Sequence, residues 1–148
     1  KTEAAKARAL AINPAVRIRT FCCRFDAQTA GEILDTAYDC AADAIDSVKD
    51  KVLLVTECKR LSIPIVSAMG AGNRLDDDFT VTDLYQTKYD GLARAMRTQL
   101  KKRGITALPV VASARPPQKR DGCPASISYP PAVAGCKLGG AIIRSLLA

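Results

Sequence analysis

The sequence contains no histidine, and this absence removes the commonest general base and metal ligand from any site. Ser-His and Cys-His catalytic pairs are therefore excluded. None of the six cysteines forms a CxxC pair, so a zinc site of standard spacing is not expected either. We interpret the cysteines that lie in apolar stretches as small core residues in a reducing cytosol, which predicts a cytoplasmic protein.

Long apolar runs and tryptophan are also missing. No stretch approaches the ~20 apolar residues that a membrane-spanning helix needs, and the start of the chain has no signal-peptide pattern. We therefore expect no membrane segment. The 148 residues, 48% hydrophobic and dominated by alanine, valine, isoleucine and leucine, are enough for one domain of helices packed on a parallel sheet.

Cations outnumber anions, which gives a net charge of +7. Such a balance favours anionic partners such as nucleotides, RNA or phosphate, but ordinary solubility explains it equally well. The basic face of a predicted helix at 92–103 has the same two interpretations. This face could bind the tRNA backbone, or it could be a solvated helix face, and solvated faces are the more frequent of the two. Its members are Arg94, Arg97, Lys101, Lys102 and Arg103.

Residues 38–76 are the most informative stretch. A run of small residues from Cys40 to Asp46 predicts a buried strand with Asp46 at its carboxyl end, and Ser47 can cap the helix that follows. That helix has an inward stripe, and residues 63–66 predict a second buried strand before a loop that contains Gly70 and Gly72. Strand, helix and strand form a parallel crossover, so Asp46 and the glycine loop are expected at the same sheet edge, where a nucleotide would bind.

The remaining patterns predict further elements. A helix is expected over residues 1–12, and alternation predicts a half-buried strand over 16–21, with Cys22 and Cys23 at its core and exit. The sequence also predicts a short helix at 29–35, strands at 79–84 and 108–112, a polar mobile loop at 115–124 and a last helix at 132–147. Gly135 and Gly139 on that helix suggest close packing on the sheet.

Several segments resemble one family: KTEAAKARALAINP, DAIDSVKDK, IPIVSAMGAGNRLD, TDLYQT, LARAMRTQLKKRGI and PPAVAGCKLGGAIIRSLLA. They are similar to the ubiquitin-activating-type (ThiF-type) adenylating enzymes, and within them to the tRNA threonylcarbamoyladenosine dehydratases. The resemblance implies an α/β, Rossmann-like fold with a mainly parallel sheet flanked by helices. It covers nearly the whole chain, as one ThiF-type domain over residues 1–148 that lacks the first strand and the phosphate loop.

The resemblance also implies a site. ATP would lie across the carboxyl edge of the sheet, with Asp46 as catalytic residue and ligand of Mg²⁺. The residues implied to contact ATP are Lys1, Ala44, Ile45, Asp46 and Lys49. Independently of the resemblance, the place of the glycine loop after a buried strand favours a substrate pocket formed by Gly70, Gly72, Asn73 and Arg74. Asp46 could instead be an N-cap or a salt-bridge partner near a helix start, and Lys1 a frayed terminal lysine. The glycine loop could be an ordinary turn, and Arg74 a surface arginine.

The implied reaction is ATP-dependent adenylation of a carboxylate, most simply the dehydration and cyclisation of threonylcarbamoyladenosine in tRNA. The family pattern implies a homodimer and allows a sulfur-relay protein partner. Because the glycine-rich loop that precedes Lys1 in the family is missing, we expect the chain as given to hold part of an ATP site and to be inactive alone. Two alternatives are adenylation of a ubiquitin-like sulfur-carrier C-terminus, and a non-catalytic dimerisation or tRNA-docking module.

Overall fold

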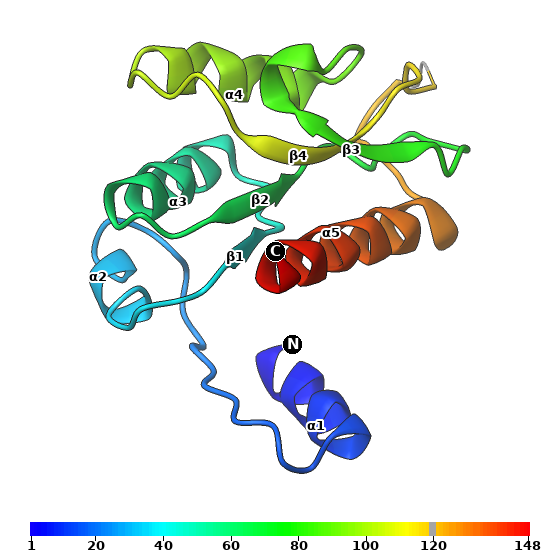
Figure 1. Cartoon of the computed structure of the whole chain (residues 1–148). Helices are drawn as coiled ribbons and strands as arrows, with labels where there is room; N and C mark the ends of the chain where they lie inside the picture. The colour runs from blue at the N-terminus through cyan, green and yellow to red at the C-terminus, as the bar shows by residue number, and fades with distance from the viewer. Residues whose placement is uncertain (119–120) are drawn as a thin grey trace. The chain divides into compact units, whose positions relative to one another are not determined.

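The computed structural model describes residues 1–118 and 121–148, and its chain divides into two compact units, Lys1–Thr36 and Ala37–Ala148. Figure 1 shows the elements of both units along the chain. Lys119 and Arg120, in the loop predicted over 115–124, lie outside the described residues. Within the described residues no helix is both long enough and apolar enough to cross a membrane.

The first unit contains two helices and no strand. Helix α1 (Thr2–Ile12) ends at Asn13, and α2 (Ala30–Ile33) is short, as the sequence predicts. The strand predicted over 16–21 is wrong, because no residue of that segment pairs into a sheet in the described chain. Alternation is a local pattern, whereas a strand exists only when a neighbour accepts its hydrogen bonds. Cys22 and Cys23 are accordingly exposed rather than part of a core.

The second unit is built on a four-stranded sheet of order β1-β2-β4-β3. Its strands are β1 (Ala41–Asp43), β2 (Ile65–Ala68), β3 (Phe79–Asp83) and β4 (Pro109–Ser113). β1, β2 and β4 are parallel, and β3 is an antiparallel edge strand. The expected mainly parallel sheet flanked by helices is thus confirmed, as is the crossover that joins β1 to β2 through α3 (Val48–Arg60).

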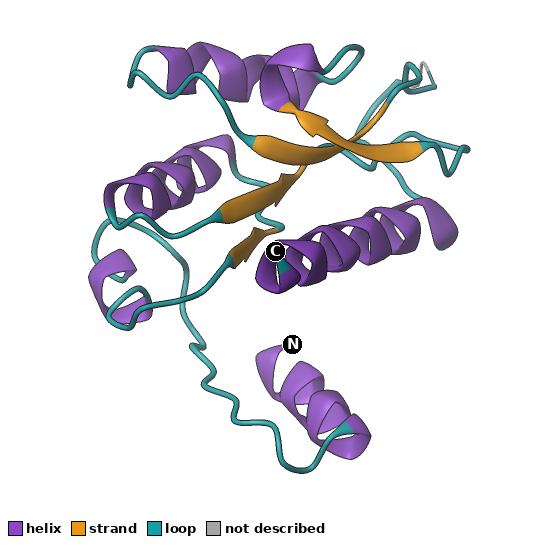
Figure 2. Cartoon of the chain, viewed as in Figure 1, coloured by secondary structure: helices purple, strands orange, loops and turns teal. Residues whose placement is uncertain are grey.

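Helices cover both faces of this sheet (Figures 1 and 2). Helix α5 (Tyr129–Leu147) packs across one face of the sheet. Helix α3 contacts β1 and β2 and packs against α4 (Gly91–Lys101). A short 3₁₀ helix, η1 (Leu84–Gln86), precedes α4 in the chain. The core under α5 consists of six buried residues: Val66, Phe79, Val111, Ala134, Leu138 and Ala141. Because side chains alternate along a strand, Ile65 and Ser67 point to the opposite face, toward α3.

The structure corrects three details of the sequence-based expectations. β1 ends at Asp43, so Asp46 lies in the loop after the strand, and β2 begins at Ile65, two residues later than predicted. Gly135 and Gly139 are exposed and an added methyl group would contact nothing there, so close glycine packing on the sheet is wrong. The helix is anchored by its larger side chains instead, since Leu138 between them is buried.

The amphipathic helix α4 begins and ends with side-chain and backbone caps. Asp90 caps its start by accepting a hydrogen bond from the Ala93 amide at 2.8 Å. At its end Gly104 has a φ of +71°, and the amides of Gly104 and Ile105 donate to the carbonyls of Lys101 and Leu100. This is the Schellman arrangement, which favours glycine because an L-residue is strained at positive φ.

We predict opposite effects of alanine at the two ends of α4. Gly104→Ala should lower the free energy of unfolding by about 1 kcal/mol, because its left-handed backbone disfavours a Cβ. Gly91→Ala, at the first helical position with open space around it, should raise that free energy by about 0.4–1 kcal/mol. Urea denaturation of the two variants tests this, and equal effects would contradict the capping role of Gly104.

Candidate functional site at the carboxyl edge of the sheet

A cleft of about 610 Å³ opens where β1 and β2 end. One wall is the loop that leaves β1, a second is the loop that leaves β2, and the first turns of α5 and residues 124–126 complete it. Ligands bind at this edge of open parallel sheets because the loops that follow neighbouring strands diverge there. The predicted residues that line it are Ala44, Ile45, Asp46, Gly70 and Gly72.

Asp46 is the one charged side chain among the described residues that line the cleft. It is exposed, and within the described part of the chain its carboxylate makes no hydrogen bond or ion pair. The N-cap alternative for Asp46 is wrong, since Ser47 occupies that position and its hydroxyl oxygen accepts from the Asp50 amide. The Asp46 carboxylate is therefore available to a ligand in the cleft.

A buried ion pair holds the turn that carries Asp46. Asp43 and Lys51 are both fully buried, and Lys51 Nζ donates to Asp43 Oδ2 at 2.8 Å. The Ser67 hydroxyl also donates to Asp43 Oδ2, while Asp43 Oδ1 accepts from the Ile45 amide at 3.0 Å. Burial lowers the pKa of Lys51, and the nearby Asp43 carboxylate opposes this effect.

Sequence reasoning missed this pair, although two signals were present. Asp43 stands in a run of alanines that forms a buried strand, and a buried acid requires a cation or several hydrogen-bond donors. Lys51 lies on the inward stripe of α3, together with Val52 and Val55, where a lysine is otherwise unexpected. A charged residue of each sign on two facing buried surfaces predicts an ion pair.

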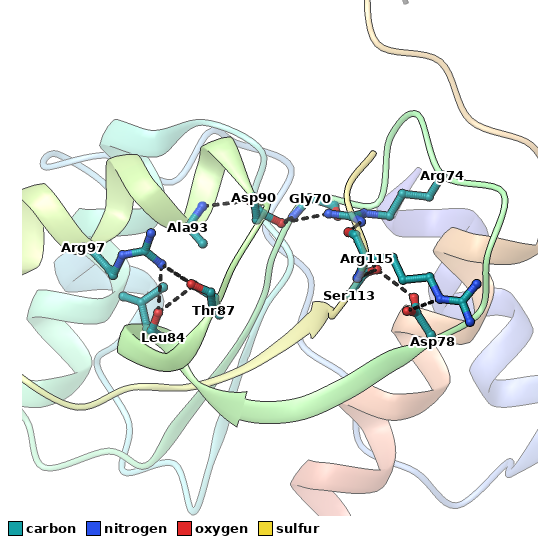
Figure 3. A network of polar contacts seen from close by, with 10 residues as sticks. All are labelled: Gly70, Arg74, Asp78, Leu84, Thr87, Asp90, Ala93, Arg97, Ser113 and Arg115. Carbon is teal, nitrogen blue, oxygen red and sulfur yellow. Dashed lines mark hydrogen bonds and ion pairs between the residues drawn. The ribbon is translucent and has the colours of Figure 1, made fainter. Parts of the chain in front are cut away.

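The glycine loop after β2 is held through both backbone groups of Gly70 (Figure 3). The Gly70 amide donates to Asp90 Oδ2 at 3.0 Å, and its carbonyl accepts from Arg74 Nε at 3.0 Å. Arg74 also donates to the Arg115 carbonyl, and its Nη2 lies 3.6 Å from Asp90 Oδ2. The side chains of Arg74 and Asp90 are almost fully buried. In this conformation Arg74 is neither a surface arginine nor open to a substrate, because its guanidinium is engaged inside the protein.

Asn73 likewise holds the loop together. Its φ is +55°, a conformation that asparagine tolerates better than most residues. Its amide donates to the Ala125 carbonyl at 2.7 Å, and its side-chain oxygen accepts from the Ala125 amide at 2.9 Å. Asn73 thereby fixes residues 124–126, which form the outer rim of the cleft.

Of the two other residues implied to contact ATP, Lys49 does not line the cleft and Lys1 belongs to the first unit. Lys49 is exposed and lines a separate groove between α3 and α4, together with Val48, Val52, Gln99 and Arg103. Lys1 is exposed at the start of α1, in the first unit. The structure thus brings together five of the predicted site residues, and it assigns Asn73 and Arg74 to the support of the cleft wall.

Among the described residues no group of three or more histidine, cysteine or acidic side chains could hold a metal ion. A single exposed carboxylate nevertheless fits Mg²⁺, which keeps several waters and is commonly bound by one or two carboxylates together with phosphates of a nucleotide. The exposed Asp46 carboxylate is the group in this cleft that suits such an ion. Buried Cys58 is not a ligand candidate, since burial raises the pKa of its thiol to about 11.

The ThiF family model matches residues 1–147 of the chain. The chain belongs to the ThiF family. Among curated proteins, this ThiF-family chain is 30% identical to the tRNA threonylcarbamoyladenosine dehydratase of Bacillus subtilis, over 99% of this chain and 66% of that protein. It is 35% identical to the enzyme of the same name from Escherichia coli, over 68% of this chain and 38% of that protein.

Comparison with solved structures leads to proteins of the same name. The fold matches crystal structures of the E. coli tRNA N6-threonylcarbamoyladenosine dehydratase TcdA in complex with AMP and with ATP, with TM-scores of 0.92 and 0.90 at 26% identity. The match covers 99% of this chain and 64% of the AMP-bound protein. The chain therefore spans slightly less than two thirds of the length of these relatives.

We predict that Arg74 and Asp90 are strongly coupled. Arg74→Ala should lower the free energy of unfolding by about 3–5 kcal/mol, because it leaves a buried carboxylate without its cation. The double variant Arg74→Ala/Asp90→Asn should lose less than the sum of the two single variants. A double-mutant cycle by chemical denaturation measures this coupling, and strict additivity would show that the pair does not act as a unit.

Proposed function

We propose that this protein uses ATP to dehydrate threonylcarbamoyladenosine in tRNA. The observation that carries the proposal is the cleft at the carboxyl edge of the sheet, in which Asp46 and the glycine loop converge. It is supported by the chain's membership of the ThiF family and by its likeness to proteins named tRNA threonylcarbamoyladenosine dehydratase, one of them solved with AMP and with ATP. We further propose that it works in the cytoplasm.

The proposed chemistry has two steps. A carboxylate oxygen of the substrate attacks the α-phosphorus of ATP, and pyrophosphate leaves. The carbamoyl group of the same substrate then attacks the activated carbonyl carbon, a ring closes, and AMP leaves. The net change is loss of one water from the nucleoside. No protein nucleophile is required, which agrees with a chain that has no histidine and a cleft whose described lining has no cysteine.

In this proposal Asp46 acts on the nucleotide side and the glycine loop on the acyl side. Mg²⁺, when bound to Asp46, would offset the repulsion between the carboxylate and the phosphates. Gly70 and Gly72 line the cleft without side chains, so the acyl group can approach the backbone closely. A side chain at either glycine would also crowd its neighbours. A methyl group added at Gly70 would lie 3.3 Å from Asp90 Oδ2, and a methyl group added at Gly72 would lie 3.3 Å from Pro124 Cβ.

Homodimerisation and a sulfur-relay partner remain predictions from the family pattern, as do the phosphate contacts of Lys1. The sulfur-carrier alternative predicts AMP formation with a carrier protein and no change in modified tRNA. The names of the relatives support the tRNA substrate instead. The non-catalytic alternative predicts a folded protein with no nucleotide binding.

We predict that Asp46→Asn lowers the rate of tRNA dehydration by about 100-fold or more, the loss typical when a group that stabilises transition-state charge is removed. Full-length protein that contains this chain is incubated with ATP and tRNA that carries threonylcarbamoyladenosine, and nucleosides and AMP are measured by mass spectrometry. Asp39→Asn removes an equal charge at an exposed site outside the cleft and should change neither product. Unchanged tRNA with the unmodified full-length protein would overturn the proposed function, and full activity of Asp46→Asn in that protein would overturn the assigned residue.

A further inference from the structure

We propose that the groove between α3 and α4 binds the sugar-phosphate backbone of the tRNA substrate beside the cleft. This inference rests on the proposed function and adds a docking surface to it. The groove has a volume of about 350 Å³. Its lining comes from the first two turns of α3 and the end of α4, which lie far apart in the sequence.

Two cations from different helices converge on this groove. Lys49 lies in the first turn of α3, and Arg103 lies just after the last turn of α4, and both are exposed. Lys101 and Lys102 are also exposed at the same end of α4. Val48 and Val52 give the groove an apolar component that suits a ribose or base, and Gln99 supplies an amide.

Hydrogen bonds to Gln99 hold the Arg103 guanidinium in one orientation. Its Nη1 nitrogen donates to the Gln99 backbone carbonyl at 2.8 Å and to the Gln99 side-chain oxygen at 3.2 Å. Within the described residues its remaining nitrogens make no hydrogen bond and no ion pair. A guanidinium fixed by one nitrogen presents its other donors at less entropic cost when it binds a phosphate.

The described lining of the cleft offers no cation to the phosphates of an RNA backbone. That lining contains Asp46 and no basic side chain. Arg74 is buried beneath the glycine loop, and Arg97 donates to the carbonyls of Leu84 and Thr87 (Figure 3). A nucleoside that enters this cleft as part of a tRNA brings its flanking phosphates with it, so the cations that bind them must lie beside the cleft.

The start of α3 connects the two features. Asp46 faces the cleft immediately before the helix, and Lys49 faces the groove from its first turn. A chain of nucleotides that crosses this helix start can therefore place one residue in the cleft and neighbouring phosphates on the groove. This placement reassigns Lys49 from ATP to the RNA backbone, and it removes Arg97 from the basic face expected on α4.

The test is the salt dependence of tRNA binding. We expect Lys49→Gln/Arg103→Gln to lower the slope of log Kd against log salt concentration by about 1.4–1.8, since each lost phosphate contact removes about 0.7–0.9. ATP affinity, measured by calorimetry, should not change, because neither residue lines the cleft. The charge-preserving variant Lys49→Arg/Arg103→Lys should keep the slope of the unmodified protein.

A matched control removes two exposed lysines elsewhere. Lys59→Gln/Lys137→Gln causes the same change in net charge, outside the groove, and should leave the slope nearly unchanged. An equal slope for the groove variant and the unmodified protein would overturn the docking surface while the dehydratase function stands. If the slope is unchanged and sedimentation shows that the groove variant has lost self-association, the groove binds a second copy of the chain and the RNA docking surface is overturned. An unmodified full-length protein that neither binds nor dehydrates tRNA would overturn both proposals.

Discussion

The buried ion pair between Asp43 and Lys51 is the interaction on which the site depends. It joins the end of β1 to the inner face of α3, and Ser67 on β2 donates to the same carboxylate. An uncompensated charge at this depth would cost several kcal/mol, so the strand, the helix and the neighbouring strand are constrained to one arrangement. The remaining oxygen of Asp43 binds the Ile45 amide and so fixes the turn that presents Asp46.

The second wall of the cleft follows the same principle with different residues. Asp90 caps α4 and binds the Gly70 amide, while Arg74 binds the Gly70 carbonyl and pairs with Asp90. In both walls a buried carboxylate accepts a hydrogen bond from a backbone N–H group of the loop that lines the cleft. Charged groups below the surface therefore set the shape of the cleft, while its described lining is nearly uncharged.

This division of charge leaves the described lining of the cleft without cations for the anionic substrate of the proposed function. Adenylation brings a carboxylate against a triphosphate, and the repulsion must be offset by cations that the described lining of the cleft does not contain. In the proposed function, a metal ion bound to Asp46 would supply part of the missing positive charge. In the proposed docking surface, the exposed cations at the start of α3 and the end of α4 would bind the RNA backbone outside the cleft.

The sequence by itself determined the local features: the crossover from β1 to β2, the cap at Ser47, the amphipathic α4, and the convergence of Asp46 with the glycine loop at one sheet edge. Periodicity and capping are local, and the carboxyl-edge rule follows from parallel pairing alone. Only the tertiary structure decided which polar residues face inward. Arg74, Asn73 and Arg97 look like ligand-binding residues in the sequence, but their partners are distant in the chain or lie in other elements. The strand expected at 16–21 fails for the same reason, because hydrogen-bond partners are set by the fold and not by the segment.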